Sequence, residues 1–176
     1  NLLIIFLVIF TTVKYHSVYN TKRKFMDLQN VDLKTSIDAS LIDSKLKNLK
    51  WITPSFPLDP RKEIDLIKQT IEVLKQDKRN KMMITEYQFF SLILEENLNI
   101  PNRWYTHDNN SYPLKNHKYY KFYKEHFTNL IKKNNVEVIY ITGDSKIKNF
   151  KIYLDNICFT EEEINEISMV HELHKC

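Results

Sequence analysis

The feature that most constrains this chain is an apolar run at residues 2–10, LLIIFLVIF, which holds nine apolar residues without interruption. The uncharged residues continue to position 13, and Lys14 ends the run. A helix that crosses a bilayer needs about 20 mostly apolar residues, so this segment is too short to cross one alone. The run therefore predicts the end of a transmembrane helix that begins upstream, and we assign residues 1–20 to it.

Three other interpretations of the apolar run compete with a membrane helix. It could be the core of a cleaved signal peptide, although no small-x-small cleavage site follows it. It could be a buried strand, because Ile, Phe and Val favour β-structure. It could also be the edge of a soluble domain that has been cut.

The rest of the chain has the length and composition of one globular domain. The sequence is 43% hydrophobic and 27% charged, which separates it from disordered chains. We expect a connector with an amphipathic helix over residues 21–48 and a soluble α/β domain over residues 49–176.

The scarcity of glycine excludes two classes of nucleotide-binding protein. Gly143 is the single glycine. A dinucleotide-binding turn needs several glycines and a P-loop needs two, because the backbone must approach the phosphates closely. The net charge of +4 is a mild excess spread along the chain. Nucleic-acid binders concentrate basic charge or carry a recognisable motif, so we expect no nucleic-acid partner.

The order of the predicted strands and helices indicates a small α/β layer fold. Strands are predicted at residues 49–53, 81–86 and 136–142, and a further one at 150–154. The third is almost continuously apolar, which is typical of a central strand covered on both faces. We expect a small three-layer domain with a three- to four-stranded, mostly parallel sheet.

Helices are predicted where apolar residues recur at intervals of three and four. Asp59 before Pro60 is typical of a helix start. Thr160 and Glu163 form a capping box, which predicts a final helix with His171 on its apolar face. The predicted helices cover residues 35–49, 60–78, 87–97, 119–131 and 160–171, and the apolar face of the fourth includes Tyr119, Phe122, His126 and Phe127.

Two candidate ligand residues follow the second predicted strand. Ligands of parallel sheets gather beyond the carboxyl ends of the strands. Glu86 and Tyr87 stand at such an end and are candidate ligand contacts. The alternative is that Glu86 is a solvated carboxylate or the partner of a nearby Lys or Arg.

The loop at residues 100–113, IPNRWYTHDNNSYP, is the segment richest in candidate ligand contacts. Arg103 could hold an anion through two hydrogen bonds, and Tyr112 offers a flat face to a sugar ring. His107 and Asp108 could act as a base and the group that orients it. A long loop with aromatic anchors is also a common structural cover, and the two roles can coexist.

The C-terminal residues raise the questions of a metal and of a disulfide. His171, His174 and Cys176 are possible zinc ligands, but the spacing of the two histidines differs from H-E-x-x-H and no fourth ligand is placed. We therefore expect no metal site and no cofactor. Cys158 and Cys176 are the only cysteines. A bridge between them would suit an oxidising compartment, and two reduced thiols are the alternative.

Four segments carry a resemblance to a known family: LKWITP, MITEYQFFSLIL, PNRWYTHDNNSYP and VEVIYIT. They resemble the tails of bacterial polytopic membrane proteins that look like family 39 or dolichyl-phosphate-mannose-type glycosyltransferases, of the glycosyltransferase-C-like superfamily. Members have many transmembrane helices followed by a soluble domain outside the cytoplasm, and they transfer a sugar from a polyprenyl-phosphate carrier. The resemblance implies a C-terminal periplasmic domain at the bacterial inner membrane. Its partners would be membrane lipid, the polyprenyl-phosphate sugar, and a glycan or lipid acceptor.

The resemblance supplies no catalytic residue. The family's acidic catalytic residue lies in the first external loop, and no position here matches it. The domain would therefore contribute acceptor or glycan contacts, and the alternative is a non-catalytic binding or assembly domain on a membrane anchor. A basic cluster at residues 22–24 opposes the external placement, because basic flanks prefer the cytoplasmic side.

Overall fold

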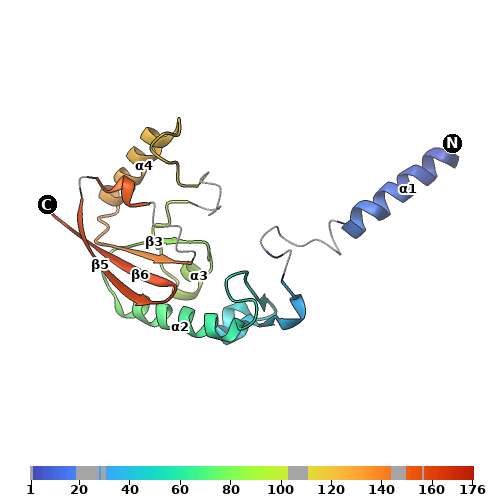
Figure 1. Cartoon of the computed structure of the whole chain (residues 1–176), viewed down its shortest axis with the longest axis horizontal. Helices are drawn as coiled ribbons and strands as arrows, with labels where there is room; N and C mark the ends of the chain where they lie inside the picture. Colours follow the sequence, from blue (N-terminus) through green and yellow to red (C-terminus); the bar gives the residue numbers. More distant parts are fainter. Residues whose placement is uncertain (1, 19–27, 29–30, 103–110, 144–149, 156) are drawn as a thin grey trace.

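The computed structural model describes residues 2–18, 28, 31–102, 111–143, 150–155 and 157–176. Within these residues the protein is a mixed α/β structure. A four-stranded sheet has the order β3-β4-β6-β5, and β1 (Ile37–Asp38) and β2 (Lys50–Trp51) form a separate antiparallel pair. The helix α1 (Leu2–His16) lies apart from both sheets (Figure 1).

The four-stranded sheet is mixed, which corrects the expectation of a mostly parallel sheet. β3 (Lys81–Thr85) and β4 (Val138–Thr142) are parallel, and each of their residues is buried. β6 (Ser168–His174) runs antiparallel to β4, and β5 (Cys158–Asn165) runs antiparallel to β6. In the described part of the chain, one strand pairing of this sheet is therefore parallel and two are antiparallel.

The predicted C-terminal helix is wrong, because its residues form the β5–β6 hairpin. A capping box contributes only about 1 kcal/mol to a helix. The hairpin instead gains a continuous ladder with β4 and buries Val170 and His171. This pairing joins residues distant in sequence, so the local pattern at Thr160 and Glu163 does not reveal it.

The helix α2 (Pro60–Gln76) confirms the prediction for residues 60–78. The side chain of Asp59 caps it by accepting a hydrogen bond from the backbone N–H of Lys62 at 3.2 Å. The expected apolar stripe is buried and consists of Ile64, Ile67, Ile71 and Leu74.

Two hydrophobic cores lie on opposite faces of the sheet. Alternate residues of a strand point to opposite faces. Met83 and Tyr140 pack with α2, whereas Met82 and Ile139 pack with α4 (Tyr120–Lys133). Figure 1 shows α2 and α4 on the two sides of the sheet.

Only part of the predicted apolar face of α4 is buried. Phe127 and Ile131 are buried in the core. Tyr119 and Phe122, in contrast, are 55% and 76% exposed, and His126 is also exposed. A helix on a sheet buries one narrow stripe, and these three positions lie outside that stripe, with Phe122 on the outward face of the helix.

Three shorter segments also differ from the predictions. Residues 150–153 form a 3-10 turn and not a strand. The helix expected at 35–49 is replaced by single 3-10 turns, because Asp38 and Asp43 each cap a turn with their own side chain. α3 is limited to Phe90–Leu94, because Glu95 adopts a left-handed conformation with φ 54°.

The apolar run at the start of the chain forms α1, and α1 has no buried residue. The interpretation of this segment as a buried strand is therefore wrong. Within the described ranges, no helix combines the length and the apolarity that crossing a bilayer requires.

A disulfide joins Cys158 to Cys176, with their Cα atoms 5.1 Å apart. Cys158 begins β5, and Cys176 lies two residues beyond the end of β6. The bond therefore closes the open end of the hairpin and keeps the chain terminus on the sheet.

Candidate functional site

The single glycine of the chain stands at the carboxyl edge of the sheet, directly after β4. Gly143 has φ +114°, a conformation that residues with a side chain rarely adopt. A Cβ atom at this position would lie 2.9 Å from Oε1 of Glu86. The Glu86 side chain, which follows β3, therefore lies against the backbone of Gly143.

Close to this edge lies a buried carboxylate that sequence reasoning missed. Glu63 is 0% exposed and accepts hydrogen bonds from three side-chain donors. The Tyr87 hydroxyl donates at 2.6 Å, the Trp51 indole N–H at 2.9 Å and the Thr53 hydroxyl at 2.7 Å. Tyr87, a predicted ligand residue, is thus engaged with Glu63.

The contacts of Glu63 have a structural consequence. They fasten the segment after β3 and the segment around β2 to the first turn of α2. The free N–H groups at a helix N-terminus favour a negative charge, which supports a carboxylate at this position. Glu63 directly precedes Ile64 and therefore borders the apolar stripe of α2. This position is a weak indication in the sequence that Glu63 is buried.

A second buried polar cluster ties β6 to α2. The hydroxyl oxygens of Thr70 and Ser168 are 2.7 Å apart, and those of Ser168 and Thr142 are 3.0 Å apart. The Asn165 amide donates to Thr70 Oγ1 at 3.3 Å. These groups are hydroxyls and an amide, and the described cluster contains no base that could activate a hydroxyl as a nucleophile.

The structure separates the predicted ligand residues. Tyr87 belongs to the core on the α2 face, and Tyr112 belongs to the core on the α4 face. Tyr112 contacts the rings of Tyr123 and Tyr153, with centroid distances of 5.8 and 6.4 Å. Tyr87 and Tyr112 therefore do not form one pocket. Arg103, His107 and Asp108 lie outside the described residues.

The two described ends of the predicted ligand loop are joined to each other, and the second end is also bonded to the core on the α4 face. The Asn102 amide donates to the backbone oxygen of Ser111 at 2.6 Å. The Tyr153 hydroxyl donates to the backbone oxygen of Pro113 at 2.6 Å. The described loop ends thus fit the structural-cover interpretation.

His171 on β6 lies between two aromatic rings, and Oε2 of Glu161 is 3.5 Å from its Nε2. It is 0% exposed, and neither ring nitrogen has a hydrogen-bond partner among the described residues. Phe150 and Phe159 lie 5.0 and 5.1 Å away, centroid to centroid. Burial lowers the pKa of His171 below its ordinary value, with Glu161 raising it and Lys151 lowering it to smaller extents. Across the described ranges, no group of three or more His, Cys, Asp or Glu residues could hold a metal ion.

A charged network lies between α2 and the start of β3. Arg79 donates to both carboxylate oxygens of Asp77, and the Tyr140 hydroxyl donates to Asp77 at 2.7 Å. Burial would raise the pKa of Asp77, but these hydrogen bonds outweigh burial and lower the pKa to about 2. Arg79 also pairs with Glu172 of β6. The network thus joins α2 to β4 and β6.

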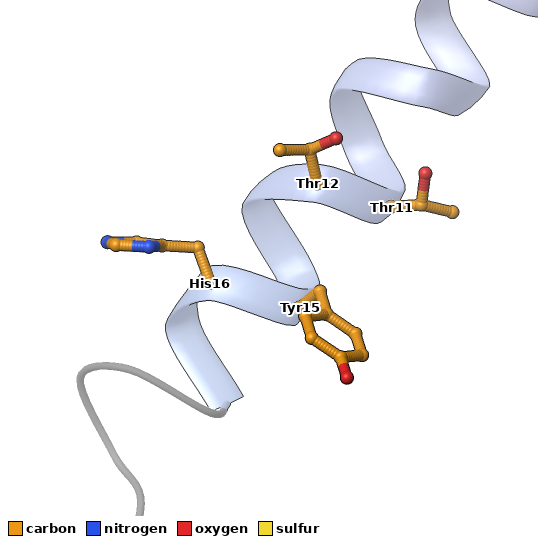
Figure 2. A pocket seen from close by; sticks show the side chains of 4 residues that line it. All are labelled: Thr11, Thr12, Tyr15 and His16. Carbon is orange, nitrogen blue, oxygen red and sulfur yellow. The ribbon is translucent and has the colours of Figure 1, made fainter.

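The described surface has a hollow at the end of α1 and a groove beside α4. One, of 420 Å³, lies at the end of α1, where Thr11 and Tyr15 project to one side and Thr12 and His16 to the other (Figure 2). These four side chains do not converge on a common point. The other hollow is a groove of 660 Å³ beside α4, lined by Pro113, His117, Lys118, Tyr119, Phe122, Tyr123 and His126.

No protein-family model, no curated protein and no solved structure matches this chain.

Replacing Tyr87 by Phe tests the anchoring of the sheet edge. Tyr87→Phe removes one of three donors from a buried carboxylate, so the free energy of unfolding should fall by about 1–3 kcal/mol. Urea unfolding in mild detergent measures it. The matched control, Tyr119→Phe, alters an exposed hydroxyl and should change stability by less than about 0.5 kcal/mol. Equal stability of Tyr87→Phe and the wild type would contradict the anchoring role.

His171 should make the domain less stable in mild acid. Burial keeps the pKa of folded His171 below the ordinary value of 6.5, so the unfolded chain binds more protons as the pH falls. The contribution of neutral His171 to the free energy of unfolding is complete above about pH 6.5. It is lost as the pH falls toward and through the pKa of His171 in the folded protein. Urea unfolding at about pH 7.5 and about pH 5.5 should show this loss.

The control for this experiment is a second histidine. His171→Leu should flatten the dependence on pH, whereas exposed His117→Leu should leave it unchanged. A wild-type free energy of unfolding that stays constant between the two pH values would show that His171 is not held neutral by burial.

Proposed function

We propose that this chain is a membrane-attached α/β domain that lies outside the cytoplasm and contributes acceptor or glycan contacts to a membrane glycosyltransferase using a polyprenyl-phosphate sugar. The observation that carries the membrane part is the exposure of α1. Each apolar side chain from Leu2 to Phe10 is at least half exposed, between 50% and 86%. A helix that is apolar on all sides needs an apolar environment.

Transfer of the α1 side chains from water into lipid would release a large free energy. Burying one Leu, Ile or Phe side chain is worth about 1.5–3 kcal/mol relative to leaving it exposed. Nine apolar side chains, Val8 included, would together contribute roughly 13–27 kcal/mol, which is at or above the roughly 5–15 kcal/mol of an ordinary domain. The Thr11 hydroxyl bonds to the Leu7 backbone oxygen at 2.7 Å, which reduces the cost of placing it in lipid.

The disulfide supports the placement outside the cytoplasm. Disulfides persist in oxidising compartments such as the periplasm and are rare in the reducing cytosol. The bond between Cys158 and Cys176 therefore favours the periplasmic side over the cytoplasmic side.

A contact role fits the described residues better than a catalytic one. The hydroxyls of Thr70, Thr142 and Ser168 bond to one another, and Glu63 is enclosed by its three donors. Glu86 lies at the carboxyl edge of the sheet, against the backbone of Gly143, and is partly exposed. In this proposal, Glu86 contacts the acceptor or glycan, and the catalytic acid is supplied by another part of the enzyme.

A second candidate function also fits the described residues. A non-catalytic binding or assembly domain on a membrane anchor would need α1 and a docking surface, but no sugar donor. The two candidates differ in whether membranes containing the protein transfer a sugar.

Sugar transfer is the measurement that tests the glycosyltransferase proposal. In membranes that hold the protein expressed from its native gene, Glu86→Ala should lower transfer from a radiolabelled polyprenyl-phosphate sugar by about tenfold, because one charge-assisted contact is lost. Glu125→Ala, at an exposed position of α4, should leave transfer unchanged. Protein amounts are compared by immunoblot.

The two possible negative results have different meanings. Transfer that is unaffected by Glu86→Ala removes Glu86 from the contact role. Wild-type membranes that show no transfer above those of a strain lacking the gene contradict the glycosyltransferase proposal and leave the binding or assembly domain.

A further inference from the structure

The outward face of α4 exposes aromatic side chains that the core does not use. Phe122 is 76% exposed and Tyr119 is 55% exposed. They are three positions apart and therefore lie on the same face of the helix. The buried stripe of α4, with Phe127 and Ile131, is directed into the core instead. A large apolar ring in this position gains free energy when another surface covers it.

Cations surround the two aromatic side chains. Residues 114–126 contain four lysines and a single acidic residue, Glu125. Lys124 is paired with Asp155 at 2.6 Å. The other three lysines, Lys115, Lys118 and Lys121, are exposed.

The groove of 660 Å³ lies within this aromatic and basic surface. Lys118 holds its ammonium group 4.8 Å from the centre of the Tyr119 ring, so the cation stands beside the aromatic face. His117 and His126 also line the groove and offer ring nitrogens to a phosphate. The surface thus combines apolar rings with groups that bind anions.

We propose that this face of α4 is a membrane-docking surface, in which Phe122 and Tyr119 enter the bilayer interface and Lys115, Lys118 and Lys121 contact anionic lipid headgroups. Aromatic side chains prefer the level of the headgroups, and basic clusters bind anionic leaflets. The inference rests on the part of the proposed function that places α1 in the bilayer.

The short segment between α1 and the domain favours the bilayer as the partner of this surface. Residues 17–30 separate α1 from Val31, which is 14 residues. Even a fully extended chain of this length spans only about 46–50 Å. The domain therefore stays near the membrane, and a short tether of this kind gives a high effective concentration of lipid.

Tryptophan quenching by brominated lipid tests the docking surface directly. The full chain is placed in phosphatidylcholine vesicles with or without phosphatidylglycerol, and Phe122→Trp is compared with Leu92→Trp. Leu92 is 56% exposed and belongs to α3, whose buried residues Phe90 and Ile93 pack in the core on the opposite face of the sheet. Both variants share the same native tryptophans, so the wild-type signal is subtracted from each.

We expect the added tryptophan at position 122 to be quenched at least about twofold more than that at position 92 when phosphatidylglycerol is present. Changing Lys115, Lys118 and Lys121 to Gln should weaken docking by roughly fivefold per lysine. About 1 M salt should reduce the quenching, because the Debye length is then about 3 Å.

Vesicle flotation of the same samples separates the possible failures. If the chain floats with the vesicles but positions 122 and 92 are quenched equally, the docking surface is wrong and the anchoring by α1 stands. If quenching at position 122 does not depend on phosphatidylglycerol, the role of the lysines is wrong. If the chain does not float, both the docking surface and the membrane attachment are overturned.

Discussion

The parallel pairing of β3 with β4 is the constraint on which the rest of the domain depends. Each residue of both strands is buried, so the pair needs a cover on each face. The helix α2 supplies one cover and α4 the other. The pairing also brings Glu86 and Gly143 to the same edge, because each follows one of the two strands. The candidate contact residue thus takes its place from the register of this strand pair.

Three polar side chains near the sheet, Glu63, Asp77 and His171, differ in their hydrogen bonding. Glu63 is held by three neutral donors, and Asp77 by Arg79 and Tyr140. His171 instead has no hydrogen-bond partner in the described part of the chain, so its burial favours the neutral ring. The first two groups strengthen the joints between α2 and the sheet, whereas the third makes stability depend on pH.

Much of the central fold could be predicted, because its determinants are local. Asp59 and Pro60 mark the start of α2, and the continuous apolar run of β4 indicates a strand covered on both faces. The β5–β6 hairpin could not be predicted, since its stabilising contacts are with β4, and the capping pattern at Thr160 and Glu163 pointed to a helix. For the candidate site, the sequence predicts the position of one residue and not the contacts of another. Glu86 follows from its position after β3, but a carboxylate such as Glu63 gives no sign in the sequence that three donors surround it.

Flotation of the full chain with vesicles is the most direct measurement of whether α1 lies in the bilayer. The wild type should remain with the vesicles after a carbonate wash, because nine apolar side chains leave water. Replacing Leu3, Phe6, Leu7 and Phe10 by Gln should release the chain with its circular dichroism otherwise unchanged. Replacing exposed Leu58 and Leu92 by Gln should not release it. Recovery of the wild type in the soluble fraction, or flotation of the α1 variant to the same extent, would contradict the membrane attachment.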